Sequence, residues 1–257
     1  MEVPRVSLAS LTRAEFIRRF QEPNLPVIIT EATKDWRATA DWVDQSGRPD
    51  TAKLSALFGD DVVTIHGEGG KTRDMRVADY MEWWQQRSQD GTSADTVLYL
   101  KDWHVAQRHQ AYEAYTTPPC LGEDWLNEHW AAQPTDGPEG TRVGDAGDHR
   151  FVYVGPRGSV TRLHADVLFS YSWSANVAGR KLWRLVPAEQ RHLVSDAATR
   201  PLAHSLAEIS AAEVSAGLTP LVVTQEAGEL LFVPSGWYHE VENLEDTISI
   251  NHNVSQP

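Results

Sequence analysis

Residues suited to metal chemistry lie in the stretch 161–183, whose sequence is TRLHADVLFSYSWSANVAGRKLW. Apolar and polar residues alternate along it, and this alternation predicts two β-strands separated at Ala178-Gly179. Side chains two residues apart on a strand point to the same side, so we expect His164 and Asp166 on one face. An imidazole nitrogen and a carboxylate oxygen placed together in this way are two ligands for a metal ion.

The His-x-Asp spacing alone is weak evidence, because about one such match is expected by chance in a chain with ten histidines. An exposed histidine on an edge strand is the alternative interpretation. The strand-like run 230–241 favours a metal site, since it carries His239 after a Pro-Ser-Gly turn. Lys181 is expected on an inward strand face with Trp183. Two histidines and one carboxylate leave half of the octahedral coordination of Fe(II) open, which indicates an iron site at His164, Asp166 and His239.

Bulk composition narrows the class of protein. The 257 residues suffice for one large domain, and 41% hydrophobic and 23% charged residues are typical of a soluble protein. A net charge of −13 argues against sequence-independent nucleic-acid binding but is compatible with a basic peptide partner. The sequence contains neither a membrane-length apolar run nor a signal peptide. With one cysteine, Cys120, the chain fits a reducing compartment, so we expect a cytoplasmic protein, with the nucleus as an alternative.

The predicted elements are mainly strands, with a helical N-terminal third. Strands are expected at 25–30, 61–66, 96–103, 151–154, 221–224, 230–233, 237–242 and 247–253, in addition to those of the stretch 161–183. Helices are expected at 8–20, 54–58, 77–87, 125–132, 187–194 and 206–216. Many short strands with glycine and proline between them predict a double-sheet jelly-roll barrel, a double-stranded β-helix, with α-helices packed outside. We expect a single domain, 1–257, with a helical elaboration at 1–95 and the barrel core at 96–257.

The sequence also allows predictions for three loops, for Cys120 and for histidines outside the proposed metal site. The loops 34–50, 67–74 and 133–148 are candidates for substrate selection at the barrel mouth. Cys120 has no neighbouring base that would make it a nucleophile. His252 alternates with the asparagines on either side and is expected to point away from them. Five further histidines lie in polar surroundings and are expected at the surface; they are His104, His109, His129, His192 and His204.

Five runs of this sequence resemble the Jumonji-C (JmjC) branch of the 2-oxoglutarate- and Fe(II)-dependent oxygenases. The runs are LYLKDWH (98–104), FVYVGPRGS (151–159), HADVLFSYSWSANVAGRKLW (164–183), QEAGELLFVPSGWYH (225–239) and NLEDTISINHN (243–253). The resemblance extends from about residue 25 to the end of the chain. It implies a cupin-like barrel that binds Fe(II), uses 2-oxoglutarate as co-substrate and consumes O2.

The resemblance assigns roles position by position. His164, Asp166 and His239 match the iron ligands, and Lys181 matches the residue that holds the distal carboxylate of 2-oxoglutarate. Thr161 and Tyr99 match hydroxyl donors to the same carboxylate, and Asn253 and Asn251 match polar residues near the co-substrate. Ser174 stands at a position where many relatives have asparagine. A buried carboxylate needs a paired cation, so the physical role of an inward lysine agrees with this assignment.

The resemblance also implies the reaction and its partners. It points to a protein hydroxylase that acts on a lysine side chain of a translation termination factor or a similar cytosolic protein. An N-methyl-lysine demethylase with the same iron site and a non-catalytic metal-binding cupin are the alternatives. The chain ends eighteen residues after His239, before the C-terminal helices with which the family often forms dimers. A dimer is therefore not carried over from the family, and the sequence leaves the oligomeric state open, with a monomer as one alternative. No nucleic acid or membrane is expected as a direct partner.

Overall fold

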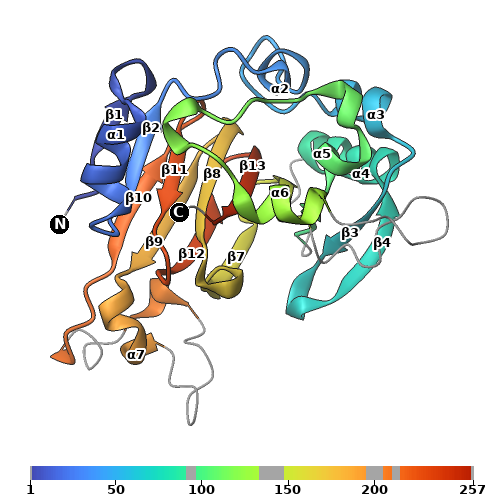
Figure 1. Ribbon diagram of the computed structural model, residues 1–257. Coiled ribbons are helices and arrows are strands. Elements are labelled where there is room, and N and C mark those ends of the chain that lie inside the picture. The colour runs from blue at the N-terminus through green and yellow to red at the C-terminus, as the bar shows by residue number, and fades with distance from the viewer. Residues whose placement is uncertain (1, 91–96, 133–147, 195–204, 210–214, 256–257) are drawn as a thin grey trace.

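The structure is a computed structural model that describes residues 2–90, 97–132, 148–194, 205–209 and 215–255. Within these ranges the chain forms two facing β-sheets with helices outside them (Figure 1). The larger sheet has nine strands, in spatial order β1 (Arg5–Ser7), β2 (Val27–Thr30), β11 (Leu230–Val233), β8 (Tyr171–Ala178), β13 (Thr247–Val254), β6 (Arg150–Gly155), β5 (Tyr99–Trp103), β3 (Val62–His66) and β4 (Thr72–Arg76). The smaller sheet has four, β10 (Leu221–Gln225), β9 (Lys181–Val186), β12 (Tyr238–Asn243) and β7 (Val160–His164). This arrangement confirms the predicted jelly-roll class.

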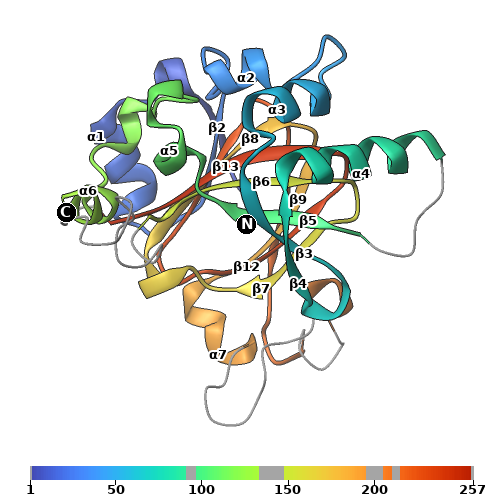
Figure 2. The ribbon, with the colours of Figure 1, turned by 90° about the vertical axis from the view of Figure 1, so that its right-hand side faces the viewer.

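Most helices lie on one side of the barrel. The helices are α1 (Arg13–Phe16), α2 (Arg37–Asp41), α3 (Thr51–Phe58), α4 (Val77–Asp90), α5 (Val105–Arg108), α6 (Trp125–Ala131) and α7 (Arg191–Val194). Figure 2 shows α1 to α6 over the outer side of the larger sheet, with α7 beside the smaller sheet. None of the helices in the described ranges has the length and hydropathy required to cross a bilayer.

Two apolar layers hold the sheets and helices together. On β2, Val27 and Ile29 pack in the layer between the larger sheet and the helices, whereas Ile28 packs in the layer between the two sheets. The alternation follows from the period of two along a strand, and it explains why this strand is apolar on both faces. Trp183 and Leu185 meet Ile28 from the smaller sheet. The layer between the sheets therefore contains apolar side chains from both of them.

The N-terminal third contains more sheet than the sequence pattern predicts. We expected a helical elaboration at 1–95, but this segment supplies the strands β1 to β4 of the larger sheet. The short strands β1 and β4 were not predicted, because each is a sheet edge whose pairing partner is fixed by the fold. The helix expected at 8–20 is a 3₁₀ turn followed by α1 and a π-helical turn at Ile17–Gln21. Its start is fixed by Thr12, which forms a capping box with Glu15.

The stretch 161–183 holds three strands rather than the two expected. The predicted break at Ala178-Gly179 is confirmed, since β8 ends at Ala178 and β9 begins at Lys181. A further break separates β7 from β8, because β7 ends at His164 and a 3₁₀ turn follows at Val167–Phe169. Asp166 is therefore outside the strand that carries His164, and the expectation that both share one strand face was wrong.

A candidate metal and co-substrate site inside the barrel

His164 and His239 face each other across two paired strands of the smaller sheet. The register of β7 and β12 places them directly opposite one another, and their ring centroids are 4.2 Å apart. A shift in register occurs between His239 and Val241, where the β7–β12 ladder has a bulge. Bulges re-aim side chains next to functional sites, and this one lies beside the two rings.

Asp166 joins the histidines from the turn after β7. One ligand atom from each of His164, Asp166 and His239 lies within 4.8 Å of the others. The Ser172 hydroxyl donates a 2.7 Å hydrogen bond to one carboxylate oxygen of Asp166, which leaves the second oxygen available. The structure thus brings together the three residues that the sequence proposed as ligands, although Asp166 arrives by a turn instead of a strand.

Backbone carbonyl oxygens orient both imidazole rings. His164 Nδ1 lies 2.8 Å from the carbonyl oxygen of Arg162, and His239 Nδ1 lies 3.4 Å from that of Trp237. A proton on each Nδ1 leaves Nε2 as a lone-pair donor, as metal-binding histidines require. Burial and the neighbouring His164 lower the pKa of His239 to about 4, so that ring is neutral at pH 7. The donor set, two imidazoles and a carboxylate, fits a divalent transition metal.

Lys181 is a buried amine that lines the same cavity as the three proposed ligands. It is the first residue of β9, and only 1% of its surface is exposed. Within the described part of the chain, it has neither a hydrogen-bonding partner nor an acidic residue within 4.0 Å. Burial, with a smaller effect from Lys101, lowers the pKa of its amine to about 7. A buried amine without a carboxylate partner is a site for an anionic ligand group.

Polar groups without partners lie in the same cavity. The cavity has a volume of about 40 Å³ and is lined by residues that include both histidines, Asp166, Lys181, Ser174 and Asn251. The Ser174 hydroxyl and the Asn251 side-chain oxygen are buried and have no hydrogen-bonding partner. Because buried polar atoms are normally paired, these two atoms indicate a polar ligand in the cavity. Lys181 adds a buried amine that a carboxylate group of such a ligand would pair with.

Other residues predicted for the co-substrate are distributed around this cavity. Thr161 and Asn253 line it, and the Asn253 amide donates a 3.3 Å hydrogen bond to Ser170. Tyr99 is buried, with its hydroxyl beside the side chains of Thr161 and Asn243, and it lines a larger adjoining groove. Thr161 and Asn253 border both spaces, whereas Tyr99 lines the larger groove and not the inner cavity.

Sequence reasoning missed several residues of this region. Ser172, which holds Asp166, could have been noticed from its inward strand position, whereas Asp102 and Tyr153 carry no pattern that marks them. Two histidines were also misplaced: His104 is bonded to Asp148 at 3.0 Å and His109 to Asp61 at 2.9 Å, so neither is a free surface group.

The expectations for His252 and for the predicted substrate-selection loops are confirmed in part. His252 points away from the cavity as expected and stacks on Trp173 at 4.0 Å. Residues Gly67–Gly70 of the predicted selection loop 67–74 line the larger groove, but none of 34–50 does. The expected loop 133–148 lies outside the described residues except for Asp148.

A jelly-roll barrel with a histidine and carboxylate donor set in its interior is the architecture of the cupins. Residues 12–256 match the Cupin-like domain family, and the chain belongs to that family. The resemblance to JmjC oxygenases is confirmed by curated relatives. The "2-oxoglutarate and iron-dependent oxygenase JMJD4" of Homo sapiens is 41% identical over 93% of this chain and 58% of its own length.

Two other relatives carry different activities in their names. The "Arginine-specific demethylase JMJ20" of Arabidopsis thaliana is 39% identical over 98% of this chain and 57% of its own length. The "Bifunctional arginine demethylase and lysyl-hydroxylase psr-1" of Caenorhabditis elegans is 28% identical over 98% of this chain and 60% of its own length. The chain thus spans somewhat more than half the length of the curated relatives it matches.

Proposed function

We propose that this protein is an Fe(II)- and 2-oxoglutarate-dependent oxygenase that hydroxylates a side chain of a protein substrate. The observation that carries the proposal is the combination, in one small cavity, of the His164, Asp166 and His239 donor set with the buried, unpaired amine of Lys181. A non-catalytic cupin has no use for that amine, and the JMJD4 relatives are named as 2-oxoglutarate and iron-dependent oxygenases.

Each residue has a defined task in this proposal. His164, Asp166 and His239 hold the metal and leave its remaining positions open. Lys181 pairs with the distal carboxylate of 2-oxoglutarate, while Thr161 and Tyr99 add hydroxyl hydrogen bonds. Ser174, Asn251 and Asn253 satisfy the co-substrate's other polar atoms. When bound, iron and 2-oxoglutarate supply the activation of O2 and the oxidation of a substrate C–H bond.

The substrate is proposed at two levels. At the coarser level it is a protein, because the psr-1 relative is named as a lysyl-hydroxylase and an arginine demethylase. At the finer level we propose a lysine side chain of a translation termination factor, or of a similar basic segment in the cytoplasm or nucleus. The net charge of −13 would attract such a segment by long-range electrostatics.

Oxidative demethylation is the second candidate. The JMJ20 and psr-1 relatives carry that activity in their names, and hydroxylation of an N-methyl group on lysine or arginine uses the same site. The two activities differ in product, since demethylation releases formaldehyde and hydroxylation retains the oxygen on the side chain.

The test is turnover with purified protein, Fe(II), 2-oxoglutarate, ascorbate and a eukaryotic translation termination factor, followed by succinate measurement and mass spectrometry of the factor. We expect succinate formation and a 16-Da addition on lysine, both absent in His239→Ala. Succinate formation with an unmodified factor would leave the oxygenase class in place and overturn the finer substrate. Wild-type turnover by His239→Ala would overturn the metal site.

A further inference from the structure

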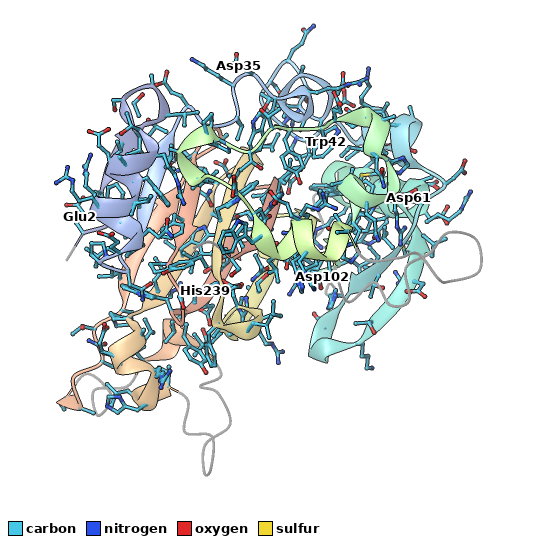
Figure 3. All side chains as sticks on the ribbon, in the orientation of Figure 1. Glu2, Asp35, Trp42, Asp61, Asp102 and His239 are labelled. Atoms are coloured by element: carbon cyan, nitrogen blue, oxygen red, sulfur yellow. The ribbon has the colours of Figure 1, made fainter. Side chains whose placement is uncertain are left out.

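A groove of about 660 Å³ adjoins the inner cavity and shares His164, Asp166 and Tyr153 with it. One wall is the edge strand β7, and the opposite wall is formed by β5, β6 and the turn between β3 and β4. Asp102 projects into this groove from the end of β5. In Figure 3 it lies on the side of His239 that faces the β3–β4 hairpin.

The backbone at Asp102 is arranged to direct its side chain out of the sheet. Between Leu100 and Trp103, β5 contains one residue more than the facing segment of β6, which is a β-bulge. Asp102 has a φ of 57°, in the left-handed region that residues other than glycine rarely occupy. Strain of this kind persists where the surrounding structure enforces it, and it concentrates at functional sites.

Tyr153 holds the Asp102 carboxylate from the metal side. Its hydroxyl donates a 2.8 Å hydrogen bond to Asp102 Oδ1. Burial and the Asp102 charge both raise the pKa of Tyr153, so the phenol stays protonated and keeps donating. The second carboxylate oxygen is left for another donor. Because the Tyr153 ring lines the inner cavity, Asp102 lies one tyrosine side chain away from the metal ligands.

Neighbouring cations do not neutralise Asp102 by direct contact. Lys101 lies over the ring of Tyr99, at 5.5 Å from the centroid, and Arg162 lies in the same groove. Within the described ranges no basic group comes within 4.0 Å of the Asp102 carboxylate. Phe151 and Tyr153 stack at 6.4 Å and provide an aromatic surface beside it. The result is an available carboxylate next to rings that can cover an aliphatic chain.

We infer that Asp102, positioned by Tyr153, binds the terminal cation of the substrate's target side chain. This inference rests on the proposed function and specifies its substrate class as lysine or arginine. Both side chains carry their charge at the end of an aliphatic stem, so an anion beyond the metal site places the stem's C–H bonds beside the metal. The same subsite accepts methylated cations, which retain their charge.

The test measures binding, so that it does not depend on turnover. Anaerobic protein loaded with Mn(II) and 2-oxoglutarate is incubated with a randomised nonapeptide library whose central residue is lysine, arginine, norleucine or glutamate. We expect lysine and arginine peptides to be retained over norleucine peptides of the same length. Asp102→Asn should weaken retention of the cationic peptides roughly 10- to 100-fold, the effect of losing a charged hydrogen bond.

Glu68→Gln is the matched control, since Glu68 lines the same groove and the substitution changes net charge by the same amount without touching Tyr153. It should change retention less than about twofold. Asp102→Lys should invert the preference toward glutamate peptides. Equal retention of lysine and norleucine peptides by the wild type, or an equal loss in Glu68→Gln and Asp102→Asn, would overturn the inference.

Peptide-independent conversion of 2-oxoglutarate to succinate separates this inference from the proposed function. Asp102→Asn should retain the wild-type melting temperature, because asparagine also tolerates the left-handed backbone conformation of this position. If wild type itself lacks the conversion, the proposed function fails while the binding comparison still decides the role of Asp102. If Asp102→Asn lowers the melting temperature, Tyr153→Phe provides a second test. This variant loses the hydrogen bond to the Asp102 carboxylate and should bind cationic peptides with a weaker preference over norleucine peptides.

Discussion

Burial of the Lys181 amine lowers the stability of the fold, yet it suits the proposed binding of a ligand carboxylate. An amine with 1% of its surface exposed loses its hydration, and the folded chain gives it no anionic partner within the described ranges. Its lowered pKa is the consequence of that burial. In the proposed function, the carboxylate of a bound ligand would supply the missing partner. The buried amine would then lower the stability of the ligand-free barrel and raise its affinity for a dianion.

Replacing Lys181 by alanine should raise the 2-oxoglutarate concentration needed for half-saturation by roughly two to four orders of magnitude. The reason is that a buried carboxylate left unpaired costs roughly 3–5 kcal/mol. Isothermal titration of the Mn(II)-loaded protein measures the change. Thr161→Val and Tyr99→Phe delete one neutral hydrogen bond each and should weaken binding by less than about tenfold. Unchanged affinity in Lys181→Ala would contradict the role assigned to this amine.

The pKa of Lys181 also predicts a pH dependence for co-substrate binding. In the ligand-free protein the amine titrates near pH 7, and a bound carboxylate raises its pKa. Above pH 7 binding must therefore take up a proton, and affinity should fall by up to about tenfold per pH unit. Below pH 7 the amine is already charged and this dependence disappears. Titration calorimetry at pH 8 in two buffers of different ionisation enthalpy detects the proton, and identical heats would contradict the prediction.

At the scale of elements, the site depends on the turn between β8 and β9. Gly179 sits there with a φ of 74°, and a Cβ atom at this position would lie 2.1 Å from the carbonyl oxygen of Asp246. The turn thus packs directly against the segment before β13. Because β9 starts two residues later at Lys181, the position of this turn sets where the buried amine enters the cavity.

Gly179→Ala should lower the free energy of unfolding by roughly 2–4 kcal/mol, from positive φ and the clash together. Gly228→Ala is the control, since Gly228 also has a positive φ but nothing within 4 Å of a Cβ atom. It should cost about 1–2 kcal/mol. Denaturant unfolding of both variants gives the comparison. Equal losses would show that the contact with Asp246 has no energetic importance.

At the scale of the whole molecule, the metal would join parts of the chain that are far apart in sequence. His164 is the last residue of β7 and Asp166 lies in the turn after it, whereas His239 lies on β12. A ligand that binds the folded state alone stabilises it by about 2.7 kcal/mol at a free concentration of 100 Kd. A metal bound by these three residues would therefore link separate segments of the barrel.

Adding Mn(II) at 100 times its dissociation constant should raise the melting temperature by roughly 5–10 °C, and a chelator should reverse the shift. His239→Ala should lose most of this stabilisation, because only two ligands are left. His129→Ala, which replaces an exposed histidine on α6, serves as the control and should retain it. A full shift in His239→Ala would contradict the predicted coordination. Differential scanning calorimetry provides the measurement.

The sequence by itself determined the class of the barrel and the identities of the central side chains. Alternation with a period of two is a local property, and so the faces of β9 and β12 could be predicted, including Lys181 beside Trp183. Only the tertiary structure decided how Asp166 reaches the histidines, since the turn after β7 breaks the local pattern. Pairing between distant segments likewise created the edge strands β1 and β4. Tertiary structure also decided that the polar atoms of Ser174 and Asn251 lack hydrogen-bonding partners and that β5 has a bulge at Asp102. Hydrogen-bonding partners and strand register depend on contacts between distant segments, which no local sequence pattern encodes.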